Sequence, residues 1–146
     1  MIRLKYSRTI LAFVFSFLFI GCFSPEKSEM KVELQKVNEL VKAINSSDSL
    51  SIVTNIKRTD LASDSLANEI AIRSYHWLCS QGKVEDFSIK TSVVCKQFLD
   101  NGNLVEANKI YATGRMGPRR FLFSFIFLRP PNNNKIFRLY LAPYKN

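Results

Sequence analysis

The chain has 146 residues, with 21 lysines and arginines against 12 acidic residues, which gives a formal net charge of +9. This length is sufficient for one domain with its own hydrophobic core and too short for two. The single histidine excludes a facial metal site that needs more than one histidine. No two of the three cysteines have the spacing of a pair of metal ligands. No stretch has the residues of a phosphate-binding loop or of a serine-hydrolase nucleophile turn. We therefore expect no metal, cofactor or catalytic motif.

The first 21 residues are typical of an export signal. Residues 1–8 carry three bases and no acid, and Ile10 to Ile20 are apolar apart from Ser16. A membrane-spanning helix needs about 20 apolar residues, whereas the apolar region of a secretory signal has roughly 7–15. The run is apolar on every face and stops at Gly21 and Cys22, which a buried helix would rarely do. The sequence therefore predicts a signal peptide that is removed.

The end of this run, LFIGC (Leu18 to Cys22), resembles the lipobox of bacterial lipoproteins, although Phe19 stands where that family usually has Leu. The resemblance implies that the Cys22 thiol is acylated, with palmitate-type chains, and becomes the new N-terminus. Each buried methylene contributes about 0.8 kcal/mol, so several chains hold a protein on a membrane that it does not span. Phe23 is not the Asp that resembles an inner-membrane retention mark, so an outer-membrane location is favoured.

A single domain over residues 30–146 is expected to follow a tether at residues 22–29 and to begin with three helices. Apolar residues recur at helical spacing in the first helix, which should end near Asn45; they are Met30, Leu34, Val37, Val41 and Ile44. The turn-forming NSSD stretch breaks this pattern, and a short helix is expected from about Leu50 to Ile56. A further stripe predicts a helix from near residue 60 or 64 to Ser80.

After Gly82 the period changes from helical to alternating, which predicts four strands. One face of the first strand should hold Phe87, Ile89, Thr91, Val93 and Cys95. The Asn-Gly pair within Asp100 to Asn103 favours a tight hairpin. Further strands are expected at Leu104 to Ala112, Phe121 to Leu128 and Ile136 to Ala142. The predicted fold class is α+β, with N-terminal helices packed on a curved antiparallel four-stranded meander.

The third predicted strand is apolar on both faces, and one face consists of phenylalanines: Phe121, Phe123, Phe125 and Phe127. A strand of this kind is usually central and covered on both sides. The phenylalanines then fill a core, line an apolar cavity for a lipid-like or aromatic ligand, or form a covered interface. The sequence leaves these three interpretations open.

Positive charge is concentrated in residues 107–146, which hold eight bases and no acid. Arg115, Arg119 and Arg120 cluster at one expected hairpin, where each would attract an anionic surface by about 1 kcal/mol. For an exported protein the expected partners are anionic phospholipid, lipopolysaccharide or an acidic polymer, and nucleic acid is not expected. The alternative is ordinary solubilising charge that also protects the strands from edge pairing.

The order of the elements resembles the nuclear-transport-factor-like, or cystatin-like, cone fold of small envelope lipoproteins. The stretches that carry the resemblance are VNELVKAINSSDSLSIV (Val37 to Val53) and KIFRLYLAPY (Lys135 to Tyr144). It implies a curved sheet that wraps a long helix and leaves a cone-shaped cavity. Enzymes of the family place acid, base and Tyr residues in that cavity, but many members only bind or scaffold, so the fold does not choose a function.

The sequence as a whole predicts a non-enzymatic envelope lipoprotein that binds or scaffolds at the membrane surface. The alternative is a cone-fold enzyme that uses His76 with a nearby carboxylate or Tyr, for which Asp86 and Tyr111 are the candidates. His76 is the only histidine, and a half-exposed helix position beside Trp77 is the simpler interpretation.

Cys79 and Cys95 are the two cysteines left once Cys22 is acylated. An oxidising compartment favours a disulfide, which would stabilise the domain by roughly 3 kcal/mol in the chain-entropy model. Cys79 is expected at a helix end and Cys95 at the far end of a strand of roughly 36 Å. Because a disulfide needs Cα atoms within about 7 Å, free buried thiols are favoured unless the strand bends near Ser92.

Overall fold

The computed structural model describes residues 30–144, so the predicted signal peptide, Cys22 and tether lie outside the described residues. Within these residues three helices precede four strands: α2 (Lys31–Ser46), α3 (Ser49–Ile56), α4 (Asp64–Ser80), β1 (Val84–Phe98), β2 (Leu104–Met116), β3 (Arg119–Leu128) and β4 (Arg138–Pro143). The strands form an open antiparallel sheet in the order β1-β2-β3-β4. The predicted α+β class and the four-stranded antiparallel meander are confirmed.

Local sequence signals account for the helix boundaries. Ser47 ends α2 in the left-handed conformation, with φ of 55°. Asp48 then caps α3, because its carboxylate accepts a hydrogen bond from the backbone N–H of Ser51 at 3.1 Å. Ser63 caps α4 in the same way through the N–H of Leu66 at 3.3 Å. The NSSD turn therefore ends one helix and starts the next, as predicted.

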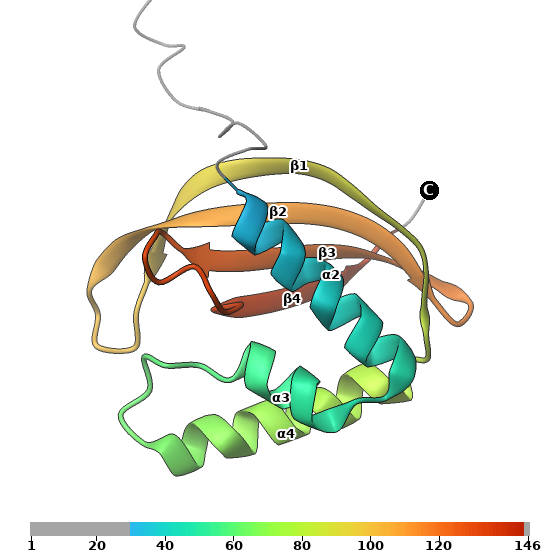
Figure 1. The fold of residues 1–146 in the computed structure, drawn as a ribbon, viewed down its shortest axis with the longest axis horizontal. Helices are drawn as coiled ribbons and strands as arrows, with labels where there is room; N and C mark the ends of the chain where they lie inside the picture. The colour runs from blue at the N-terminus through green and yellow to red at the C-terminus, as the bar shows by residue number, and fades with distance from the viewer. Residues whose placement is uncertain (1–29, 145–146) are drawn as a thin grey trace, which may run out of the picture.

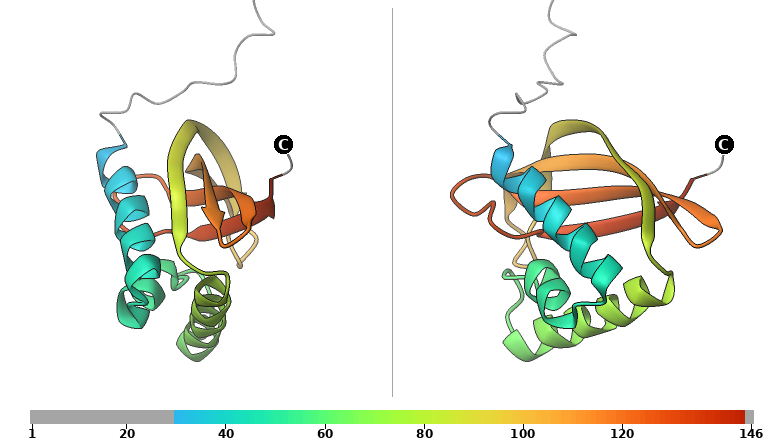
Figure 2. Two further views of the ribbon diagram at one scale, coloured as in Figure 1. Left: turned by 90° about the vertical axis from the view of Figure 1, so that its right-hand side faces the viewer. Right: turned by 45° about the vertical axis from the view of Figure 1, so that its right-hand side comes forward.

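The helices differ in how they relate to the sheet (Figures 1 and 2). α2 crosses one face of the curved sheet, beginning beside β1 and β2 and ending near α3. α3 and α4 lie beyond β4, the edge strand. From that edge they contribute Ile52 and Leu78 to the core that α2 covers. Of the helices in the described part of the chain, α2 thus lies over the face of the sheet, and α3 and α4 lie along its edge.

The main core lies between α2 and the sheet. The largest buried side chains of β3 are Phe123, Phe125 and Phe127, each at most 1% exposed, and they belong to one cluster with Val37 and Leu40 of α2. Phe87 of β1 adds edge-on ring contacts with Phe123 and Phe125, at centroid distances of 5.7 and 6.2 Å. The phenylalanine face of β3 is therefore part of a packed core.

The other face of β3 is covered in part. Ala107, Ile126 and Phe137 form a second buried cluster there, and Cys95 and Leu128 pack against it. The prediction that this strand is central is confirmed, but its second face is covered only in part, because Leu122 and Leu128 are half-buried there.

The prediction for the faces of β1 is wrong. Register shifts occur between Glu85 and Ser88 and between Ile89 and Thr91. Ile89 pairs with Ala112 on the core face, whereas Thr91 pairs with Tyr111 on the opposite face. Val93 and Cys95 follow Thr91 on that opposite face, because direct cross-strand partners share a face. An extra residue at a bulge reverses the alternation, so Phe87 and Ile89 are separated from the three residues expected beside them.

Candidate functional site

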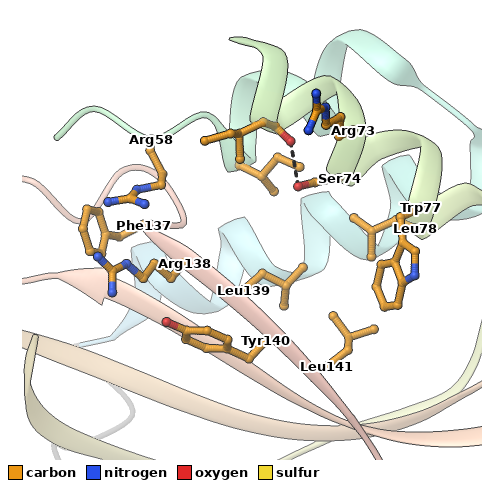
Figure 3. A pocket seen from close by; sticks show the side chains of 12 residues that line it. Arg58, Arg73, Ser74, Trp77, Leu78, Phe137, Arg138, Leu139, Tyr140 and Leu141 are labelled. Atoms are coloured by element: carbon orange, nitrogen blue, oxygen red, sulfur yellow. Dashed lines mark hydrogen bonds between the residues drawn. The ribbon is translucent and has the colours of Figure 1, made fainter. Parts of the chain in front are cut away.

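A groove of about 550 Å³ lies between α4 and the edge strand β4 (Figure 3). It exists because α4 lies beyond the sheet edge, which leaves part of its apolar surface uncovered: Ile70 is 38% exposed and Trp77 46%. Apolar side chains from α3, α4 and β4 form most of the lining: Ile56, Ile70, Trp77, Leu78, Leu139 and Leu141. The middle and the Trp77 end of the groove are therefore mainly apolar.

Two arginines and an aromatic ring form the other end of the groove. The guanidinium carbons of Arg58 and Arg138 lie 5.7 and 5.0 Å from the centroid of the Phe137 ring. Both distances are within the range of a cation–π contact. Phe137 itself is only 4% exposed, so the shared ring is fixed in the second buried cluster. The groove is consequently amphipathic, with a cationic end and an apolar end.

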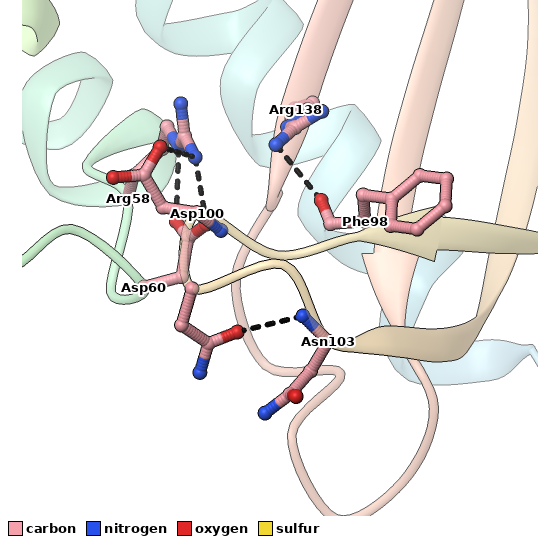
Figure 4. Close-up of polar contacts among 7 residues, drawn as sticks. Arg58, Asp60, Phe98, Asp100, Asn103 and Arg138 are labelled. Atoms are coloured by element: carbon pink, nitrogen blue, oxygen red, sulfur yellow. Dashed lines mark hydrogen bonds and ion pairs between the residues drawn. The ribbon is translucent and has the colours of Figure 1, made fainter.

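Arg58 is held by carboxylates (Figure 4). Its Nε and Nη2 donate to the two carboxylate oxygens of Asp60 at 2.9 and 2.6 Å, and Asp100 lies 3.6 Å from Nη2. The backbone N–H of Asp100 also donates to Asp60 at 2.9 Å. Burial alone would raise the pKa of Asp60, but these hydrogen bonds outweigh it and leave the pKa below its ordinary value. The contacts join the α3–α4 linker to the β1–β2 hairpin.

Arg138 is held differently. Its Nη2 donates to the backbone carbonyl of Phe98 at 3.0 Å, and its Nε is buried without a hydrogen-bond partner. Within residues 30–144 its guanidinium makes no ion pair. A guanidinium that is partly desolvated and lacks a carboxylate gains from an added anion. Arg138 is therefore the groove residue best placed to bind a negatively charged group.

The structure does not join the three candidate catalytic residues. His76 is exposed on α4, where it makes a ring contact with Tyr75 at 5.0 Å. Asp86 is exposed in β1 and lies 3.4 Å from Arg115. Tyr111 lies under the ammonium of Lys109, on the face of the sheet away from α2. In the part of the chain that is described, no hydrogen bond connects any two of the three.

The predicted basic cluster is formed at the β2–β3 hairpin. Arg115 pairs across the sheet with Arg120, and Met116 with Arg119, so the three arginines are neighbours. Arg115 is nevertheless balanced by acids of β1, since it contacts Glu85 at 2.5 Å and Asp86 at 3.4 Å. Arg119 and Arg120 are exposed at the end of the hairpin. The charge asymmetry read along the chain is thus partly cancelled in space by the neighbouring strand.

Cys79 and Cys95 are free thiols, so the possible disulfide is not formed in the structure. Cys79 packs against the main core, while Cys95 packs against the cluster on the other face of the sheet. Burial raises the pKa of the Cys95 thiol, an effect that Lys109 partly opposes. Both side chains behave as small apolar groups in this fold.

Sequence reasoning missed Arg138 and the β4 wall of the groove. The α4 wall had a signal, because the helix expected to end at Ser80 carries Leu66, Ile70 and Trp77 among more apolar positions than one packed face needs. For Arg138 the sequence offers no such signal, since it is one of eight bases in the last 40 residues.

Comparisons with models of protein families, with curated proteins and with solved structures gave no match. No helix within residues 30–144 is long and apolar enough to cross a membrane. The same residues contain no group of three or more His, Cys, Asp or Glu side chains arranged to hold a metal ion.

Proposed function

We propose that the chain is a non-enzymatic lipoprotein of the cell envelope, anchored through Cys22 and binding or scaffolding at the membrane surface. The anchor is supported by the signal-like residues 1–21 and the LFIGC stretch. As part of the proposal, the domain is of the cone type, which agrees with a curved sheet crossed by α2. The outer membrane is the preferred location.

The observation that carries surface binding is the pair Arg119 and Arg120, exposed together at the end of the β2–β3 hairpin. Neighbouring bases attract anionic headgroups additively and are screened by salt. The partner is therefore an anionic lipid, lipopolysaccharide or an acidic polymer.

Replacing Cys22 with Ser should leave an unprocessed precursor and abolish labelling by a fatty-acid probe, because the serine hydroxyl does not replace the thiol as the acylated group. Cys79→Ser is the matched control and should be labelled and processed like the wild type. The measurement is probe incorporation, together with the mass of the mature chain, in cells that express each variant. Normal labelling of Cys22→Ser would remove the lipoprotein assignment.

Replacing both Arg119 and Arg120 with Gln should weaken binding to anionic vesicles at low salt by roughly tenfold or more, since each base contributes about 1 kcal/mol. Arg115→Gln should have a smaller effect than the single variant Arg119→Gln, because Glu85 and Asp86 already balance the charge of Arg115. The protein used is residues 22–146 with Cys22→Ser, which carries no lipid. Its binding is measured by co-sedimentation with the vesicles.

The control for this experiment is the pair Lys31→Gln and Lys42→Gln, which removes the same charge from exposed positions of α2. Equal losses in the two double variants would mean that binding follows net charge and not the hairpin. If the chain with the wild-type arginines does not bind anionic vesicles at low salt, the surface-binding proposal is wrong.

A further inference from the structure

The groove between α4 and β4 combines three features of a ligand site. Its volume of about 550 Å³ lies within the range of small-molecule sites, roughly 300–1,000 Å³. Its middle and one end are apolar, through residues such as Trp77, Leu139 and Leu141, and its other end holds Arg138 (Figure 3). A molecule that satisfies both ends must have an apolar chain and an anionic head.

The comparison of Arg58 with Arg138 indicates where the head lies. Both guanidiniums contact the Phe137 ring, but only Arg58 has carboxylates, those of Asp60 and Asp100. Arg138 has one carbonyl partner, a buried Nε without an acceptor, and no ion pair within residues 30–144. Contacts with Phe137 and Phe98 hold its planar group in place before any ligand arrives, which reduces the entropy lost on binding.

Trp77 and Ile70 indicate where the chain lies. Both side chains face the groove from α4 and are more than one-third exposed, at 46% and 38%. Covering such surface with a hydrocarbon chain is favourable in proportion to the apolar area removed from water. Charge at one end and uncovered apolar surface at the other thus define one orientation of the ligand.

We propose that this groove binds a single-chain anionic amphiphile, with its carboxylate or phosphate at the Arg138 guanidinium and its alkyl chain along Leu139, Ile70 and Trp77. The inference deepens the proposed membrane-surface function, on which it rests, by naming a ligand class and a site for it. It concerns residues on the edge of the sheet, separate from the arginines of the β2–β3 hairpin.

Trp77 provides the measurement, because it is the only tryptophan of the chain and lines the groove. The chain of residues 22–146 with Cys22→Ser, free of lipid and vesicles, is titrated with dodecanoate below its micelle concentration. We expect a saturable blue shift of the Trp77 emission with dodecanoate and with dodecyl phosphate, and the ratio of the two affinities shows which of the two heads the site prefers. Dodecanol should bind at least about tenfold more weakly, and acetate or inorganic phosphate should give no shift.

Two variants that remove the same charge identify the head site. Arg138→Gln should weaken dodecanoate binding by about tenfold or more and leave dodecanol binding unchanged. Arg73→Gln is the matched control: Arg73 also lines the groove, but it pairs with Glu69 and its side chain is 79% exposed, so both affinities should persist. Ile70→Glu should weaken both ligands, and far-UV circular dichroism checks that each variant is folded.

Three outcomes would each overturn the proposal. They are equal affinity for dodecanoate and dodecanol, an equal loss of dodecanoate affinity in Arg138→Gln and Arg73→Gln, and the absence of a saturable shift of the Trp77 emission. These outcomes are separate from those of the proposed function, which depend on Cys22 labelling and on vesicle binding through Arg119 and Arg120. Normal labelling and vesicle binding without a Trp77 response would remove the groove site alone.

Discussion

Replacing Asn108 with Ala should lower the free energy of unfolding by about 3 kcal/mol, although the residue does not line the groove. The Asn108 amide of β2 donates to Glu33 Oε1 of α2 at 3.0 Å, and the two residues are 4% and 0% exposed. Loss of this donor leaves a fully buried carboxyl group without a hydrogen bond, which costs more than the loss of an exposed contact.

Glu33→Gln should have the opposite effect and raise the free energy of unfolding by about 1 kcal/mol. Glu33 Oε2 and Asn108 Oδ1 are both buried acceptors without a donor. A glutamine at this position keeps one acceptor and adds an N–H₂ group, which is the kind of donor that the Asn108 oxygen lacks. Glu33 lies in the first turn of α2, where a negative charge is favoured by about 0.3–1 kcal/mol. The gain in the free energy of unfolding is therefore smaller than the new hydrogen bond alone would give.

Urea denaturation followed by far-UV circular dichroism measures both changes. Asn108→Ala in the Glu33→Gln background provides the last corner of a double-mutant cycle, and a coupling energy clearly different from zero is expected for residues in contact. If Asn108→Ala is within about 0.5 kcal/mol of the wild type, the buried pair contributes little and this account of α2 docking is wrong.

The same pair shows where sequence reasoning stops. The stripe of α2 was expected at Met30, Leu34, Val37, Val41 and Ile44, and three of these residues are buried, while Leu34 and Val41 are only half-buried. The helix is rotated so that Glu33 and Leu40 face the sheet. Periodicity predicts that a helix has an apolar face. Which residues lie at the middle of that face depends on the surface against which the helix packs, and here that surface includes the Asn108 amide.

The strands also have some features that the sequence predicts and others that it does not. Alternation and the Asn-Gly pair were enough to predict four antiparallel strands, because these signals are local. The bulges of β1 were not predictable, since a bulge is defined by which residues oppose it in β2. One inserted position moved Thr91, Val93 and Cys95 to the face away from α2, and with them one of the two candidate disulfide cysteines.

The candidate site depends on long-range contacts to an even greater degree. Arg58, Arg115 and Arg138 are equivalent in a count of charges, but two of them have carboxylate partners from other segments and Arg138 has none within residues 30–144. Only the fold reveals that difference. The sequence predicted the amphipathic helix α4, and the position of β4 beside it makes the apolar surface of that helix one wall of a groove.

Asp60→Asn should lower the free energy of unfolding at pH 7 by about 2 kcal/mol, because the hydrogen bonds that Asp60 accepts involve charged groups in a nearly dry position. Its side chain is 5% exposed, and Arg58 donates to it at 2.9 and 2.6 Å. The hydrogen bonds with Asp60 also raise the pKa of Arg58. An asparagine leaves the guanidinium with the weaker contact to Asp100 at 3.6 Å.

The effect of Asp60→Asn should also depend on pH, in a direction that follows from the lowered pKa of Asp60. The ordinary Asp pKa is about 3.9, so near pH 4 the unfolded chain binds more protons at this position than the folded chain. Stability from Asp60 is therefore fully present well above pH 4 and is lost as the pH falls through the folded pKa. The difference between the wild type and Asp60→Asn should shrink over that window, as measured by urea denaturation between pH 3 and 7.

Asp64→Asn is the matched control for this experiment. Asp64 pairs with Lys57 and its pKa is also lowered, chiefly by the hydrogen bond from Lys57, but its side chain is 79% exposed. Solvent screens that pair, so its removal should change stability little at any pH. The free energies of unfolding of the wild type and Asp60→Asn could differ by the same amount at every pH, or the two substitutions could have equal effects. Either result would show that Asp60 does not hold the α3–α4 linker through its charge. The predicted contrast requires that burial, and not the presence of an ion pair, decides how strongly a carboxylate stabilises this fold.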